Sequence, residues 1–173
     1  MKFILYLALV FSASSVLSQF DAEVAYFRHL RYNHVSPYIN LSGIHPIDQS
    51  TAKLTSHYVF KYDHSKRLVE VINHHYHTEK KHPLASIGVY KLKIEYQEGT
   101  EIWTFYDPNG KRISNDRDVY KEIYYYDKNQ LKSKLKFYDL NDLPMESNWD
   151  IAEYQWSSKD PFIIERRFNL KNE

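Results

Sequence analysis

The feature of this sequence that most constrains its fold is an alternation of apolar and polar side chains with a period of two residues. In residues 91–96, Leu92, Ile94 and Tyr96 alternate with lysine and glutamate, and residues 131–137 show the same pattern with three lysines. Successive side chains of a β-strand point to opposite faces of a sheet, so each run predicts a strand with one apolar and one polar face. The turns between the runs are short and polar, and connections that short join antiparallel neighbours.

The alternation predicts the organisation of the whole chain. Residues 57–173 are predicted to form a mainly β, antiparallel up-and-down meander of roughly eight strands, either as an open curved sheet or as a closed barrel. Before it, a helix N-cap at Asp21 and apolar residues at helical spacing predict one short N-terminal helix over residues 22–32. Those apolar residues are Val24, Phe27 and Leu30. Residues 33–56 are rich in turn signals, so residues 19–56 are expected to be a helix and loop-rich segment of the same domain.

The pair Tyr-Asp recurs at the end of four predicted strands. Its aspartates are Asp63, Asp107, Asp127 and Asp139. An aspartate side chain accepts hydrogen bonds from the backbone N–H groups of the turn that it begins, and a tyrosine ring packs at a strand end while its hydroxyl stays hydrated. Four equivalent copies indicate architecture, so we interpret these aspartates as structural turn residues and not as an acid–base pair.

One copy of this motif, residues 106–113 with the sequence YDPNGKRI, resembles the YD-type and MORN-variant hairpin repeats of exported and surface proteins of bacteria. The resemblance extends over residues 57–156, although the four copies are spaced 44, 20 and 12 residues apart and one of them has the turn glycine. The resemblance implies stacked antiparallel hairpins that encapsulate or bind other molecules. It implies no catalytic residues.

The first residues have the pattern of a secretory signal peptide. Lys2 is followed by the nine-residue apolar stretch Phe3–Phe11 and by small polar residues up to Ser18, which is too short for a permanent transmembrane helix. We therefore predict a signal peptide over residues 1–18, a secreted or periplasmic location, and no transmembrane segment after its removal.

Composition excludes several classes of function. The chain has no cysteine, which excludes a disulfide framework, a thiolate metal site and a cysteine nucleophile. Its formal net charge of +1 provides no basic surplus for phosphates, so nucleic acid is not an expected partner. No catalytic constellation is recognisable, and we expect a protein that is not an enzyme.

Two groups of residues are candidates for binding. The first is a set of aromatic residues in the second half of the chain, which form a platform for a glycan or protein partner if they are exposed and a core if they are buried. These are Trp103, Tyr124, Tyr126, Trp149 and Trp156. The second is a histidine-rich hairpin, in which imidazoles on one strand face could chelate zinc or copper. It contains His74, His75, His77 and His82. The alternative for this hairpin is a solvated tip without metal, and no other cofactor is indicated.

Three functions are consistent with these patterns. The leading hypothesis is an exported, non-enzymatic β-sheet module that binds a protein or glycan partner. A barrel-type carrier of a small hydrophobic ligand is the first alternative, and it requires a closed sheet with an apolar cavity. The second alternative is a secreted metal-binding protein that uses the histidine-rich hairpin.

Overall fold

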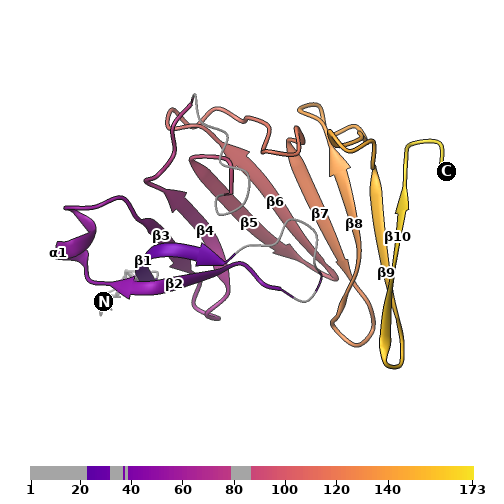
Figure 1. The fold of residues 1–173 in the computed structure, drawn as a ribbon, viewed down its shortest axis with the longest axis horizontal. Helices are drawn as coiled ribbons and strands as arrows, with labels where there is room; N and C mark the ends of the chain where they lie inside the picture. Colours follow the sequence, from indigo (N-terminus) through magenta and orange to yellow (C-terminus); the bar gives the residue numbers. More distant parts are fainter. Residues whose placement is uncertain (1–22, 32–36, 38, 79–86) are drawn as a thin grey trace, which may run out of the picture.

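The computed structural model describes residues 23–31, 37, 39–78 and 87–173, and within them it contains ten strands and one short helix (Figure 1). The predicted signal peptide lies outside the described residues. The elements are β1 (Glu23–Arg31), β2 (Ser42–Ile47), α1 (Gln49–Ala52), β3 (Tyr58–Tyr62), β4 (Leu68–Asn73), β5 (Lys91–Gln97), β6 (Thr100–Tyr106), β7 (Lys121–Tyr126), β8 (Lys132–Tyr138), β9 (Glu153–Lys159) and β10 (Phe162–Phe168). Among the described residues, no helix has the length and apolar character needed to cross a membrane.

All ten strands belong to one antiparallel sheet with the order β10-β9-β8-β7-β6-β5-β4-β3-β1-β2. From β3 to β10 each strand pairs with the next, which confirms the predicted mainly β antiparallel meander. At the other end β1 lies between β2 and β3, so the β2–α1–β3 connection passes β1. In the described part of the chain β2 and β10 are the two edges, so the sheet is open and the closed-barrel alternative does not apply.

The predicted helix over residues 22–32 is wrong, because Glu23–Arg31 form the strand β1. This strand pairs with β2 on one side and with β3 on the other. The hydrogen bonds to these two strands satisfy its backbone N–H and C=O groups, as the hydrogen bonds within a helix would. In a strand, apolar residues spaced three apart lie on alternate faces of the sheet. Phe27 packs against Phe60 at a centroid distance of 5.1 Å, while Val24 lines a groove on the opposite face.

The helix of this region is α1, and it lies in the segment that the sequence predicts to be loop-rich. Asp48 is its N-cap, since the carboxylate accepts a hydrogen bond of 2.7 Å from the backbone N–H of Thr51. The same segment also contributes the strand β2.

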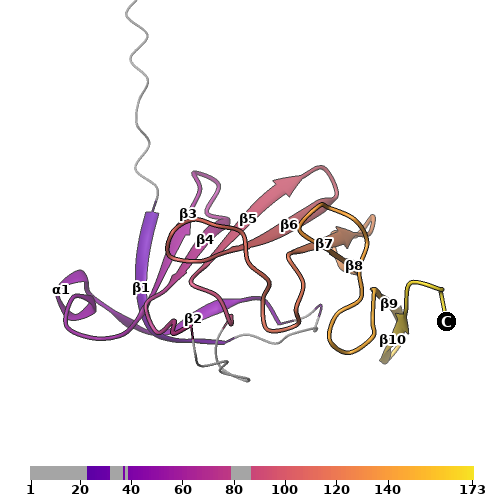
Figure 2. The same cartoon turned by 90° about the horizontal axis from the view of Figure 1, so that it is seen from above.

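The two faces of the sheet have different environments. One face, here called the core face, carries Phe60, Val71, Leu92, Phe105 and Leu135, which are fully buried. The connections between strands cover it (Figure 2): Val89, Val119 and Ile151, from the β4–β5, β6–β7 and β8–β9 connections, belong to the same core cluster. The opposite face, here called the outer face, carries alternating tyrosines and charged residues. Among them are Lys93, Tyr125, Lys134, Lys136 and Glu153.

One turn geometry recurs at the ends of several strands. In each Tyr-Asp copy the aspartate Oδ1 accepts hydrogen bonds from the backbone N–H groups of the residues two and four positions later. The N···Oδ1 distances are 2.8–2.9 Å. The residue three positions after the aspartate has a left-handed backbone with φ between 60° and 80°. The four residues in this position are Lys66, Gly110, Gln130 and Asp142.

The same turn also occurs without aspartate. Asn115 and Asn169 accept the same two backbone N–H groups through their amide oxygens, and Ser147 accepts the first of them through its hydroxyl. Each of these turns again has a left-handed residue in the fourth position: Asp118, Asn172 and Asp150. The motif is therefore more frequent in the structure than the Tyr-Asp pairs alone indicate.

Candidate functional site

Aromatic residues that are separate in sequence meet at one end of the core face, where the β3–β4, β5–β6 and β7–β8 hairpins turn. They border a pocket of about 300 Å³, here called the Glu101 pocket. Four aromatic and three aliphatic side chains line it, and its charged groups are one carboxylate and two lysines. The lining residues are Asn40, Leu41, Tyr62, Lys66, Leu68, Ile94, Tyr96, Glu101, Trp103, Tyr126 and Lys132.

Two β-bulges bring the lining of this pocket together. In the β3–β4 pair the register shifts after Lys61, so that Tyr62 pairs with Leu68. In the β7–β8 pair it shifts after Tyr125, so that Tyr126 pairs with Lys132. Each shift skips one residue, which moves the first residue of the second strand onto the core face.

The bulge therefore places Lys132 on the core face, whereas the other two lysines of β8, Lys134 and Lys136, lie on the outer face. Strict alternation predicts Lys132, Lys134 and Lys136 on one polar face. In the structure the side chain of Lys132 is only 10% exposed, and its Nζ lies 4.1 Å from the centroid of the Tyr124 ring and 5.6 Å from that of Trp103. These distances are within the range of cation–π attraction.

Glu101 is the polar centre of the pocket. Its Oε1 accepts a hydrogen bond of 2.5 Å from Trp103 Nε1 and lies 3.4 Å from Lys132 Nζ. Its Oε2 accepts a hydrogen bond from the hydroxyl of Tyr126. Because the residue is only 6% exposed, these three partners compensate for the loss of water around a buried carboxylate.

The two phenols near Glu101 keep their protons. Burial raises the pKa of Tyr126 well above its ordinary value, and the hydrogen bond to Glu101 raises it further. Burial and then the charge of Glu101 raise the pKa of Tyr96 in the same direction. Tyr96 donates its hydroxyl hydrogen to the carbonyl of Leu68 at 3.0 Å, so both hydroxyls act as fixed donors that hold the pocket in one arrangement.

The chemistry of this arrangement suits binding. Acid–base hydrolysis of a glycosidic bond uses a pair of carboxyl groups across the scissile bond, and Glu101 is the one carboxylate among the described residues that line the pocket. Its lone pairs accept hydrogen bonds, Lys132 donates them, and the rings offer flat apolar surfaces.

The five predicted aromatic binding residues do not form one surface. Trp103, Tyr124 and Tyr126 gather around Glu101 and Lys132, with Trp103 and Tyr124 buried in the core. Trp156 is also buried and donates its Nε1–H to Glu165 at 2.9 Å. Trp149 is 50% exposed, in the β8–β9 connection. The binding role of these five residues stays a prediction.

The histidine-rich hairpin does not form a strand face. β4 ends at Asn73, and His74 then stacks on His57 at a centroid distance of 4.4 Å. His75 stacks on Tyr58, and its Nε2 lies 3.1 Å from the carbonyl oxygen of Arg28. His77 lines a small hollow beside the β6–β7 connection, and His82 lies outside the described residues. Over the described part of the chain, no three histidine, aspartate or glutamate side chains are grouped to hold a metal ion.

Sequence reasoning missed Glu101, Lys132, Tyr62 and Tyr96 as members of one site. The signal for Glu101 was available, because it is in phase with Trp103 at a spacing of two residues and so lies on the apolar face of its strand. A carboxylate in that position needs partners. No sequence pattern indicates that Lys132 belongs to the site, because a β-bulge determines the face of the sheet on which Lys132 lies.

Comparison with known proteins provides no relative: no family model, no curated protein and no solved structure matches the chain.

Proposed function

We propose that this protein is a non-enzymatic binding module and that the Glu101 pocket holds a sugar ring of a glycan partner. The observation that carries the proposal is the combination of four aromatic rings with a buried carboxylate in one pocket of about 300 Å³. The expected signal peptide places the module outside the cytoplasm, where surface glycans are available as partners.

The chemistry of a sugar matches both halves of this pocket. One face of a pyranose ring presents C–H groups, which pack on half-buried aromatic rings such as Tyr62 and Tyr96. Its hydroxyls both donate and accept, so Glu101 and Lys132 can bind neighbouring hydroxyls of one ring. Small-molecule sites usually combine apolar walls with a few fixed polar groups, and this pocket contains both.

The test uses the three tryptophan indole N–H signals of the ¹⁵N-labelled protein. Methyl glycosides of glucose, galactose, mannose and N-acetylglucosamine serve as probes in separate titrations. Binding in the pocket shifts the Trp103 indole signal and leaves the Trp149 signal, which belongs to an exposed ring far from the pocket, unchanged. Phenylalanine substitutions assign the signals. If no glycoside moves the Trp103 signal at millimolar concentration, the proposal is wrong.

A pair of tyrosine variants tests the role of the carboxylate. Tyr126→Phe removes the hydroxyl that holds Glu101 Oε2 and is expected to weaken binding about fivefold to tenfold, as for loss of one hydrogen bond. Tyr125→Phe is the matched control, because the adjacent Tyr125 lies on the outer face beside Tyr138. Equal effects of the two variants would show that the pocket is not the binding site.

A further inference from the structure

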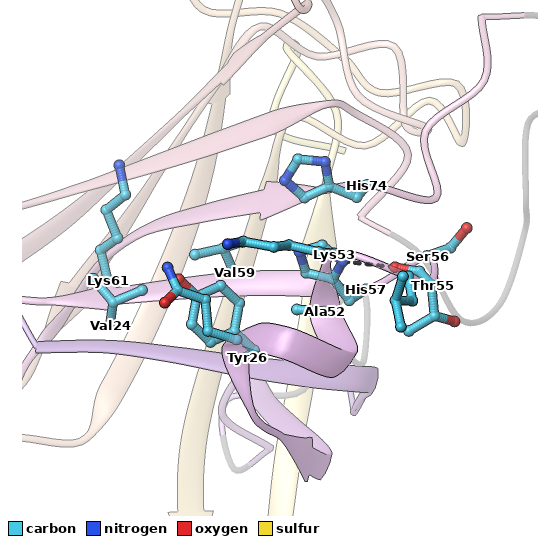
Figure 3. A pocket seen from close by; sticks show the side chains of 12 residues that line it. Val24, Tyr26, Ala52, Lys53, Thr55, Ser56, His57, Val59, Lys61 and His74 are labelled. Carbon is cyan, nitrogen blue, oxygen red and sulfur yellow. Dashed lines mark hydrogen bonds between the residues drawn. The ribbon is translucent and has the colours of Figure 1, made fainter.

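A second hollow lies on the outer face, at the β2 end of the sheet (Figure 3). Helix α1 and the residues that follow it border an open groove of about 780 Å³, here called the α1 groove. Its apolar lining includes Val24 and Tyr26 of β1, Val59 of β3, Ala52 of α1 and the exposed Leu54 after α1. Val59 alternates along β3 with Phe60, which faces the core, so this groove and the Glu101 pocket are on opposite faces of the sheet.

The polar lining of the α1 groove is basic. It includes Lys53, Lys61, His57 and His74, and no aspartate or glutamate occurs among the described residues that line it. Lys61 Nζ lies 2.6 Å from a carboxylate oxygen of Glu70, which balances its charge. Lys53 is another lining side chain, which Figure 3 labels. The groove therefore combines an apolar surface with positive charge.

Two stacked imidazoles form one end of this lining. The rings of His57 and His74 lie 4.4 Å apart with an angle of 23° between them. His57 Nδ1 donates to the carbonyl of Thr55 at 2.8 Å, so the neutral ring has its acceptor nitrogen at Nε2. Burial and the neighbouring His57 lower the pKa of His74. A negative charge beside these rings would favour a proton on one of them.

We propose that the α1 groove binds an amphiphilic carboxylate, with its alkyl chain over Val24, Tyr26 and Val59 and its carboxylate beside Lys53 and the two stacked histidines. Charge complementarity selects an anion over a cation. The apolar lining selects a molecule with a chain over a simple ion, because burial of each methylene contributes about 0.8 kcal/mol.

Calorimetric titrations with three ligands of equal chain length test the proposal. Decanoate is expected to bind, decanol to bind about threefold to fivefold more weakly, as for loss of an exposed ion pair, and decyltrimethylammonium to bind more weakly still. Equal affinity for decanoate and decyltrimethylammonium, or no binding of decanoate, would overturn the proposal.

Variants locate the site. Lys53→Gln is expected to reduce decanoate affinity about threefold to fivefold without changing decanol affinity. Lys128→Gln is the control, because Lys128 is exposed in the β7–β8 turn, and it should change neither. In the ¹⁵N-labelled protein, decanoate should shift the backbone signals of Tyr26 and Val59 and leave the Trp103 indole signal unchanged. A shift of Trp103 alone would place the ligand in the Glu101 pocket and overturn the assignment.

The pH dependence provides a further readout. The groups that face the histidine pair are Lys53 from the end of α1, Tyr26 from β1, Lys61 with Glu70 from β3 and β4, and Tyr90, whose ring lies 6.2 Å from His74. Decanoate stays ionised above about pH 6, so tighter binding between pH 8 and pH 6 reports proton uptake by the protein. We expect this dependence in the wild type and its reduction in His74→Gln. Decanoate affinity that does not change with pH in the wild type would exclude the histidines from the site.

Discussion

Arg117 and Glu122 form an ion pair that is buried on the core face. Both residues are 0% exposed. Glu122 accepts hydrogen bonds from Arg117 Nη2, from Asn115 Nδ2 at 2.6 Å and from the Tyr124 hydroxyl at 3.2 Å. Burial raises the pKa of Glu122 and the charge of Arg117 lowers it, so the two effects oppose each other. Because Arg117 belongs to the β6–β7 connection and Glu122 to β7, the ion pair holds this connection against the sheet.

Removing one partner of this pair should be far more damaging than removing both. Glu122→Ala leaves the guanidinium of Arg117 in the core without its carboxylate, and we expect the free energy of unfolding to fall by about 3–5 kcal/mol. The double variant Arg117→Met/Glu122→Met should recover most of this loss, because two apolar side chains need no ionic partner. Urea denaturation measures both. A double variant less stable than Glu122→Ala would contradict the argument.

The histidines after β4 predict how stability changes with pH. Burial, followed by the charge of His57, lowers the pKa of His74, and burial lowers that of His75. Between their folded values and the ordinary value of 6.5, the unfolded chain binds more protons than the folded chain. The free energy of unfolding is therefore expected to decrease as the pH falls below about 6.5 and to reach its full value above it. In urea titrations between pH 7.5 and pH 5, His74→Gln should reduce this slope, and an unchanged slope would exclude His74 as its cause.

At the scale of elements, the repeated turn allows a test of backbone strain. Gln130 and Gly110 occupy the same left-handed position, with φ of 61° and 80°. A β-carbon on Gly110 would meet no atom within 4 Å, so the change in stability on substitution there measures backbone strain without a steric contribution from neighbours. Gln130→Gly is expected to stabilise the protein by about 0.5–1 kcal/mol and Gly110→Gln to destabilise it by a similar amount. Thermal unfolding of the two variants and their double variant measures this, and effects of the same sign would contradict it.

The elements show what the sequence could and could not predict. Alternation identified β5 and β8, because each has one face toward the core and repeats the pattern over enough residues. It failed at β1, where the apolar residues Val24 and Phe27 lie on opposite faces and show no period of two. The turns at Asn115, Ser147 and Asn169 were missed because their amide or hydroxyl oxygens replace the aspartate, although the backbone hydrogen bonds are the same.

At the scale of the whole molecule, the second half of the sheet contains a duplication. An isolated bridge joins Tyr106 and Arg112, and 32 residues later an equivalent bridge joins Tyr138 and Pro144. The following backbone hydrogen bonds, Ile113 to Phe105 and Met145 to Phe137, are equivalent as well, both at 3.0 Å. Strand and turn spacing within one unit can be read from the sequence. The Glu101 pocket could not be read in this way, because six strands and two bulges assemble it.

An open sheet of this kind has two edges, and the structure protects them differently. β2 contains Pro46 and a left-handed backbone at His45, both of which discourage pairing with a further strand. β10 has neither, and it begins with three exposed apolar residues. The exposed fractions are 69% for Phe162, 47% for Ile163 and 36% for Ile164.

The first half of β10 has no charged residue, unlike the second half, and this apolar half of the edge predicts self-association through β10. In an antiparallel pair of two copies, each β10 would supply the partner strand that the other lacks, and the exposed side chains would be buried. We expect the mass measured by sedimentation equilibrium to rise from monomer toward dimer as the concentration increases. Ile163→Lys should weaken this association at least tenfold, because each copy then brings a charge to the contact. Leu140→Lys is the control, since Leu140 is 47% exposed in the β8–β9 connection. A wild type that remains monomeric at millimolar concentration, or equal effects of the two variants, would show that β10 is not a contact surface.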